Sequence, residues 1–141
     1  MKSTIQLNPY LNFGGQCEKA MQFYQQCFGG ELVLQRVSES SIAEQCPEGI
    51  QHQILHSTLK ADSLILMGTD MTGKEKHITG SDIAIALHGT DLEIMGQLFI
   101  QLSQSGEIIE EWSKKPWGDY FGVLKDQFGK RWMMNCSIAM H

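Results

Sequence analysis

The sequence predicts an α+β fold built from two tandem βαβββ units, and two observations lead to this prediction. The expected elements run in the order β-α-β-β-β and then repeat in the same order. The two halves also match at an offset of 76 positions, which aligns Phe23 with Phe99 and Gly30 with Gly106. Because both helices and both glycine stops agree, we interpret the pattern as a duplication. We expect a single domain over residues 1–141, with halves at 1–76 and 77–141.

The first half contains one predicted helix. Apolar residues at Ala20, Tyr24 and Phe28 follow a helical spacing, and Gly29-Gly30 is a typical helix stop. Long polar loops are expected over residues 39–49 and 69–80. The expected strands cover residues 5–13, 31–38, 50–60 and 63–68.

The second half opens on a strand over residues 82–88, whose alternation predicts packing on both of its faces. A capping box from Thr90 to Glu93 then predicts the start of a helix that ends at Ser105-Gly106. The apolar stripe of that helix consists of Leu92, Met95, Phe99 and Leu102. The remaining strands are expected at residues 107–112, 119–125 and 131–137.

Composition excludes several classes of protein. The 141 residues are 42% hydrophobic and 19% charged, with a net charge of −5, which argues against a nucleic-acid binder. No apolar run reaches the roughly 20 residues of a membrane span, and the first ten residues do not resemble a signal peptide. We therefore expect a cytoplasmic protein without membrane partners. None of the four cysteines forms a CxxC pair, so we expect free thiols rather than a zinc ribbon.

Three segments resemble a known family. They are Pro9–Phe13 with Ala20–Tyr24 and Phe28–Gly30, then Ile54–Ser57 with Leu66-Met67, and finally Trp117–Gly122 with Asp126–Gly129 and Trp132-Met133. Together they resemble the PhnB-like branch of the vicinal oxygen chelate superfamily, which includes glyoxalases, bleomycin resistance proteins and dioxygenases. Within that branch the similarity is to the 3-demethylubiquinone methyltransferase-like group. The resemblance covers nearly the whole chain except the two polar loops.

The resemblance implies that each half curls its strands into a half-barrel and that the two half-barrels enclose a cleft. It also implies a homodimer. In metal-dependent members the cleft holds a divalent ion bound by His, Gln and Glu, which stabilises negative charge on the substrate.

The metal-ligand positions of the family carry unsuitable side chains here. They fall near Pro9, at Asp82 or Ala84, near Leu64 or Leu66, and on Met133. Only Asp82 offers a donor that a divalent metal prefers, whereas such sites use three or more. We therefore predict no usual metal centre and no cofactor.

Histidines leave an alternative open. His52 and His56 are expected on one face of a strand, and His56, Asp82 and His88 are candidates for an unusual metal or acid–base centre. The alternative for His56 is an ordinary hydrogen-bonded strand histidine. No glycine-rich cofactor loop supports a methyltransferase.

The prediction for function is a PhnB-like protein that binds a small organic molecule in a largely apolar cleft. Two alternatives remain: a metal-dependent enzyme of the superfamily with an unusual centre, and an antibiotic-sequestering protein. The expected ligand-binding residues are Leu11, Phe13, His56, Trp117, Phe121 and Met133.

Overall fold

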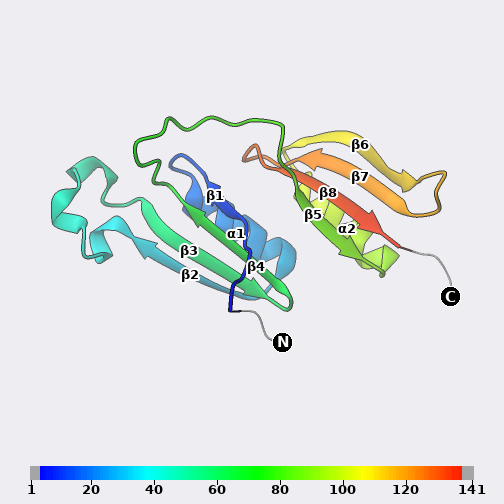
Figure 1. The fold of residues 1–141 in the computed structure, drawn as a ribbon, viewed down its shortest axis with the longest axis horizontal. Helices are drawn as coiled ribbons and strands as arrows, with labels where there is room; N and C mark the ends of the chain where they lie inside the picture. Colours follow the sequence, from blue (N-terminus) through cyan, green and yellow to red (C-terminus); the bar gives the residue numbers. More distant parts are fainter. Residues whose placement is uncertain (1–3, 138–141) are drawn as a thin grey trace. The chain divides into compact units, whose positions relative to one another are not determined.

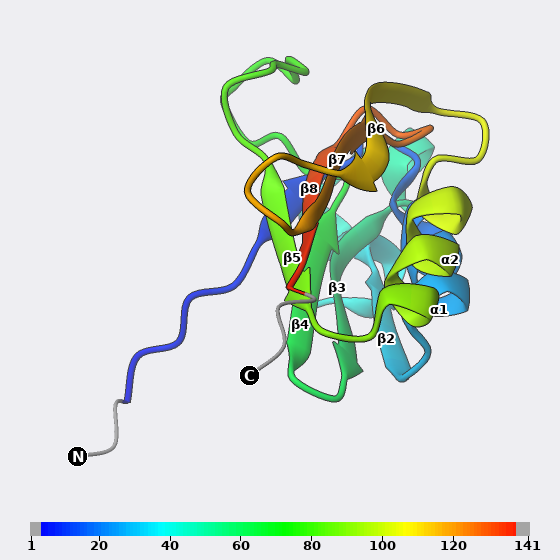
Figure 2. The same cartoon turned by 90° about the vertical axis from the view of Figure 1, so that its right-hand side faces the viewer.

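The computed structural model describes residues 4–137 and divides into two compact units, unit 1 (residues 1–77) and unit 2 (residues 78–141). Each unit has one four-stranded sheet, and one α-helix lies along one face of that sheet (Figures 1 and 2). A single domain formed by both units stays our prediction.

Unit 1 follows the predicted βαβββ order. Its sheet has the order β1-β4-β3-β2, in which β1 runs parallel to β4 and the other neighbours are antiparallel. Three short 3-10 helices occupy the connection between β2 and β3. The elements are β1 (Tyr10–Asn12), α1 (Cys17–Phe28), β2 (Glu31–Arg36), η1 (Val37–Glu39), η2 (Ala43–Gln45), η3 (Glu48–Ile50), β3 (Ile54–Ala61) and β4 (Leu64–Thr69).

Unit 2 repeats this topology. Its sheet has the order β5-β8-β7-β6, with β5 parallel to β8 and antiparallel pairs elsewhere. The predicted α+β fold of two repeated units is therefore confirmed. The elements are β5 (Ile85–Gly89), α2 (Leu92–Leu102), β6 (Glu107–Lys114), β7 (Tyr120–Lys125) and β8 (Arg131–Cys136).

Several predicted strands are shorter than expected, above all the first and the fifth. The first covers Tyr10–Asn12 rather than residues 5–13; Met67 N donates to the carbonyl of Pro9, but proline has no N–H with which to continue the ladder. The fifth covers Ile85–Gly89 rather than residues 82–88, so Asp82 precedes it. The prediction that this strand packs on both faces is also wrong, because its residues alternate between half-buried and fully exposed.

The core of unit 1 forms between α1 and the sheet. The buried helix residues are Cys17, Ala20, Met21 and Tyr24, so the buried stripe lies closer to the start of the helix than the predicted one. Gln16 occupies the N-cap position without a side-chain hydrogen bond.

Asp70, just beyond β4, caps α1 in its place. Its Oδ1 accepts hydrogen bonds from Gly15 N (2.8 Å) and Cys17 N (2.9 Å), and its Oδ2 accepts one from Ile54 N (2.9 Å). A residue distant in sequence therefore satisfies the first amides of the helix.

The core of unit 2 uses the predicted stripe of α2. Met95, Phe99 and Leu102 are buried, as are Trp132 and Met134 of β8. The helix cap differs from the prediction. Asp91 is the N-cap, and its carboxylate accepts a hydrogen bond from Ile94 N, whereas Thr90 lies before the cap.

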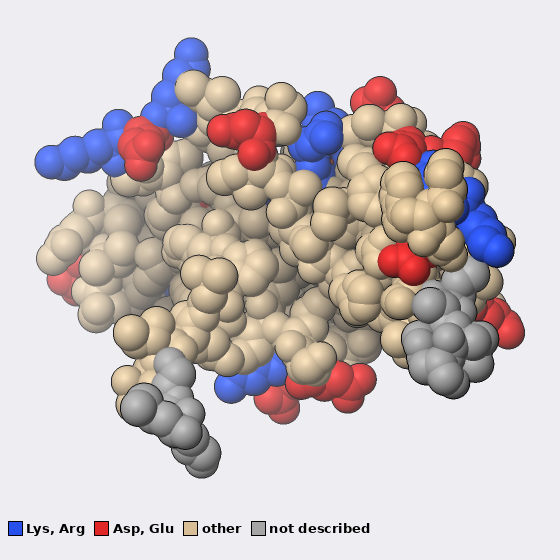
Figure 3. Space-filling model, turned by 45° about the vertical axis from the view of Figure 1, so that its right-hand side comes forward, with Lys and Arg blue, Asp and Glu red and all other residues tan. Residues whose placement is uncertain are grey.

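Charged side chains are dispersed over one face of the protein. On the face drawn in Figure 3, acidic and basic side chains form small separate groups among uncharged residues. Within residues 4–137, no helix is both long and apolar enough to cross a membrane.

Candidate functional site

The sheet face of unit 2 that lies opposite α2 carries a group of polar and aromatic side chains that contact one another. On β8, the side chains of Trp132, Met134 and Cys136 are buried toward the helix, so the alternate residues Met133 and Asn135 point to the other face. Cross-strand partners share a face, which places His88 of β5 and Phe121 of β7 beside Asn135. We call this surface the site face.

A hydrogen-bonded row crosses the site face. Asn135 Nδ2 donates to Asp119 Oδ2 over 3.1 Å and lies 3.3 Å from His88 Nδ1. His88 is exposed, whereas Asp119 and Asn135 are half-buried. The row therefore joins β5, β8 and the residue that precedes β7.

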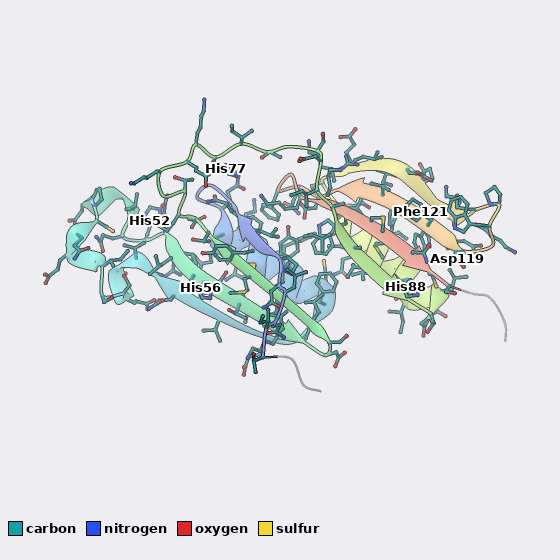
Figure 4. All side chains as sticks on the ribbon, in the orientation of Figure 1. His52, His56, His77, His88, Asp119 and Phe121 are labelled. Carbon is teal, nitrogen blue, oxygen red and sulfur yellow. The ribbon has the colours of Figure 1, made fainter. Side chains whose placement is uncertain are left out.

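Aromatic side chains lie next to this row. The rings of Trp117 and Phe121 meet edge-to-face with centroids 6.1 Å apart, and Trp117 remains 63% exposed. Trp117 lies in a turn closed by hydrogen bonds from Lys115 N to Asp119 O and from Gly118 N to Lys115 O. The same turn thus positions both Trp117 and Asp119, and Figure 4 shows His88, Asp119 and Phe121 at one end of unit 2.

Apolar side chains continue the surface from this end. Met133 is paired with Val123 on β7 and with Ala86 on β5, all on the site face. The site face therefore offers a polar end at His88 and Asp119 and an apolar middle.

The corresponding face of unit 1 has a simpler arrangement around His56. The His56 ring lies 6.0 Å from the ring of Tyr10, and its Nε2 lies 3.3 Å from the hydroxyl of Thr58. His56 is half-buried. These contacts fit the interpretation of His56 as a hydrogen-bonded strand histidine.

His52 does not share a strand face with His56, contrary to the prediction. β3 begins only at Ile54, and His52 lies exposed in the preceding turn (Figure 4). There its carbonyl accepts a hydrogen bond from Arg36 Nη1 (2.9 Å). A 3-10 helix at Glu48–Ile50 and the turn that follows it delay the start of this strand.

Leu11 and Phe13 also lie differently from the prediction. Leu11 pairs with Gly68, which faces Met21 of α1, so Leu11 is on the helix side of the sheet. Phe13 is 4% exposed and packs against the ring of Tyr24. Both belong to the packing of unit 1 rather than to the face expected to line a cleft.

The metal-ligand positions of the family do not fit a divalent ion. Pro9 has no donor side chain, Met133 offers a thioether, and Leu66 is buried in the core. Asp82 is exposed ahead of β5. Among residues 4–137, no group of three or more His, Cys, Asp or Glu side chains is arranged to hold a metal.

Buried thiols do not add a nucleophile. The Cys17 side chain is fully buried and lies 3.4 Å from the hydroxyl of Ser57, and burial raises its pKa to about 12. Burial also raises the pKa of the Cys136 thiol. A protonated, inaccessible thiol is inert, so neither residue is suited to covalent chemistry.

Two residues of the site face were missed in the sequence. Asp119 lies inside the Trp117–Gly122 segment that carries the resemblance, but no role was predicted for it, and no motif or local spacing marks Asn135. The available signal was the alternation of β8, since Met133 and Asn135 are separated by one residue and share a face. Their contact with His88 depends on strand order and register, which a single sequence does not reveal.

Comparison with known proteins gives consistent matches over nearly the whole chain. The family model described as the glyoxalase/bleomycin resistance protein/dioxygenase superfamily matches residues 6–134. Protein YjdN of Escherichia coli (strain K12) is 33% identical over 140 residues, which cover 92% of this chain and 93% of YjdN.

Solved structures agree with these matches. Protein PA1353 from Pseudomonas aeruginosa has a TM-score of 0.84 at 28% identity, with 95% of this chain and 98% of that chain covered. The PhnB protein from Bacillus cereus has a TM-score of 0.77 at 23% identity, with 94% and 100% covered, and shares the fold.

Proposed function

Because this chain belongs to the glyoxalase/bleomycin resistance protein/dioxygenase superfamily and has PhnB-like structural neighbours, we propose that it binds a small organic molecule on the site face of unit 2. The observation that carries the proposal is the Trp117–Phe121 pair beside the His88–Asn135–Asp119 row. An aromatic surface with a few convergent polar groups is typical of small-molecule sites.

The ligand we propose has a planar apolar part. Edge-to-face aromatic contacts favour such a ring, and the side chains of Met133 and Val123 extend the apolar surface. We propose binding without the usual metal centre of the superfamily, on the basis of the donor chemistry at Pro9, Asp82 and Met133.

The roles of the predicted ligand residues follow from their positions. We retain Trp117, Phe121 and Met133 as ligand contacts, and we add the polar row of His88, Asn135 and Asp119 that borders them. His56 lies on unit 1 and is left out of this site. Leu11 and Phe13 are left out because they pack against α1.

An affinity comparison tests this function. The variants Phe121→Ala and Trp117→Ala are compared with a control, Ile94→Ala. The control truncates an exposed apolar side chain on α2. Acetophenone serves as the probe, with binding followed by NMR titration. We expect each site variant to weaken binding about 5- to 10-fold, the loss typical of one aromatic contact, and Ile94→Ala to leave it unchanged. Equal binding by all variants would remove the site face from consideration.

We also propose a homodimer in the cytoplasm. β2 and β6 are edge strands of their sheets, and edges left open favour association. None of the four cysteines, all of which lie within residues 4–137, forms a disulfide, which suits a reducing compartment. Light scattering at micromolar concentration should give twice the mass of one chain, and a monomeric mass would contradict the dimer.

A further inference from the structure

The Asp119–Asn135–His88 row has a direction that follows from the chemistry of its ends. An ionised carboxylate only accepts hydrogen bonds, so the amide nitrogen of Asn135, rather than its oxygen, must face Asp119. The same nitrogen lies 3.3 Å from His88 Nδ1. Because Nδ2 carries two hydrogens, it can donate to both partners at once.

This arrangement determines where the proton of a neutral His88 ring lies. A nitrogen that accepts a hydrogen bond carries no hydrogen, so Nδ1 is bare and the ring proton is on Nε2. A hydrogen on Nδ1 would point at the hydrogen that Asn135 donates. Within the part of the chain that the structure describes, the hydrogen bond of the His88 ring joins its Nδ1 to Asn135 Nδ2.

We propose that Asp119, acting through Asn135, holds His88 in the Nε2–H form, so that the site face presents one imidazole N–H donor to a neutral aromatic carbonyl compound. The inference rests on the proposed function, because Trp117 and Phe121 supply the surface for the ring of that compound. Asp119 and Asn135 are positioning residues, whereas His88 contacts the carbonyl oxygen.

Unit 1 supplies a contrast for the role of the row. In unit 1, His56 Nε2 lies near the hydroxyl of Thr58, which can either donate or accept, so no carboxylate fixes the tautomer of His56. The two histidines should therefore differ in tautomer preference.

The tautomer is measured without a ligand. Ring ¹⁵N chemical shifts of the neutral histidines distinguish a protonated nitrogen from a bare one. We expect the Nε2–H form of His88 to predominate in the wild type and in Glu93→Gln, the matched control that removes one exposed carboxylate from α2. Asp119→Asn should shift the population toward the Nδ1–H form, because an amide at this position lets Asn135 turn its oxygen toward His88. A predominant Nδ1–H form in the wild type, or no change in Asp119→Asn, would overturn the positioning role.

The donor role is tested with two probes of similar shape. Acetophenone has a carbonyl acceptor and ethylbenzene has none. We expect acetophenone to bind about 3- to 10-fold more tightly, the range for one hydrogen bond, and expect this preference to vanish in His88→Phe. Equal affinities in the wild type would overturn the donor role and leave the aromatic site standing. If neither compound binds unit 2, the proposed function fails, and the ligand role of His88 fails with it.

Discussion

Units 1 and 2 share one backbone topology but use their polar residues differently. Each has a buried aspartate whose carboxylate accepts several hydrogen bonds. In unit 1, Asp70 accepts from Gly15, Cys17 and Ile54 and so connects α1 to β3.

In unit 2, Asp126 accepts from Phe128 N and Lys130 N through Oδ1 and from Trp132 Nε1 through Oδ2. It therefore closes the turn between β7 and β8. The N-terminus of α2 is capped by another residue, Asp91. The same type of buried carboxylate stabilises a different junction in each unit.

The faces opposite the helices diverge in the same way. In unit 1, His56 contacts Tyr10 and Thr58 on its own sheet. In unit 2, His88 belongs to a row that ends on a carboxylate beside two aromatic rings. The comparison teaches that a repeated topology maintains a helix packed on a sheet in both units, while the side chains on the opposite sheet faces differ.

The glycine shared by both units gives the largest expected effect. A Cβ at Gly30 would collide with the carbonyl oxygen of Lys60, and a Cβ at Gly106 would collide with that of Lys125. Gly30 also has a φ of 90°. We expect Gly30→Ala to destabilise the protein by about 3–5 kcal/mol and Gly106→Ala by about 3 kcal/mol.

Gly29→Ala is the control for backbone strain, since Gly29 has a φ of 75° but no atom within 4 Å of an added Cβ. It should cost about 1 kcal/mol in urea unfolding. A Gly30→Ala variant no less stable than Gly29→Ala would show that the close approach is unimportant.

The buried aspartates come next. In Asp70→Asn and Asp126→Asn, the new NH₂ group cannot accept a hydrogen bond from the donor that it faces. We expect each substitution to lower the free energy of unfolding by about 2–3 kcal/mol. Asp62→Asn is the matched control, because Asp62 is exposed in the β3–β4 turn at a φ of 47° that asparagine also adopts. Losses below about 0.5 kcal/mol for both buried sites would contradict their structural role.

The Cys17 thiol predicts a dependence of stability on pH. Its pKa is raised from 9.0 to about 12 in the folded protein, so between these values the folded state keeps a proton that the unfolded chain releases. The contribution of this thiol to the free energy of unfolding should be constant below pH 9. It should fall as the pH rises toward 12.

Urea unfolding at pH 8 and pH 10.5 measures this effect. The wild type should lose about 2 kcal/mol more than Cys17→Ala over this interval. Parallel losses in both proteins would show that the thiol ionises equally in the folded and unfolded states.

The smallest effect is expected for two surface ion pairs, of which one is taken from each unit. Arg36 and Glu18 lie 2.7 Å apart, and Lys115 and Glu110 lie 2.9 Å apart. Glu18 and Glu110 are 40% and 45% exposed, so Glu18→Gln and Glu110→Gln should each cost about 0.5 kcal/mol or less. If either variant lost more than about 1.5 kcal/mol in the free energy of unfolding, the ion pair would be better shielded from water than its exposed area suggests.

The sequence predicted the repeated fold because its signals are local. Helical spacing, the glycine stops and strand alternation depend on neighbouring residues, and the helices and strands that they predict occur in the predicted order. Strand ends were predicted less well, because Pro9 shortens β1 and the 3-10 helices delay the start of β3 to Ile54.

The candidate site was predicted only in part for the same reason. His88, Trp117, Phe121 and Met133 were singled out by residue type and resemblance. Asp119 and Asn135 become partners of His88 only after the strand order β5-β8-β7 is formed. Likewise, the inward position of Leu11 depends on its register with Gly68.

The most direct test of the account asks which unit responds to a small aromatic molecule. Backbone amide shifts of the full chain are mapped during titration with acetophenone. The account predicts that the largest changes occur in unit 2, at residues 86–89, 117–123 and 133–135. Largest changes around His56 and Tyr10 in unit 1, or on the exposed surface of either helix, would contradict it.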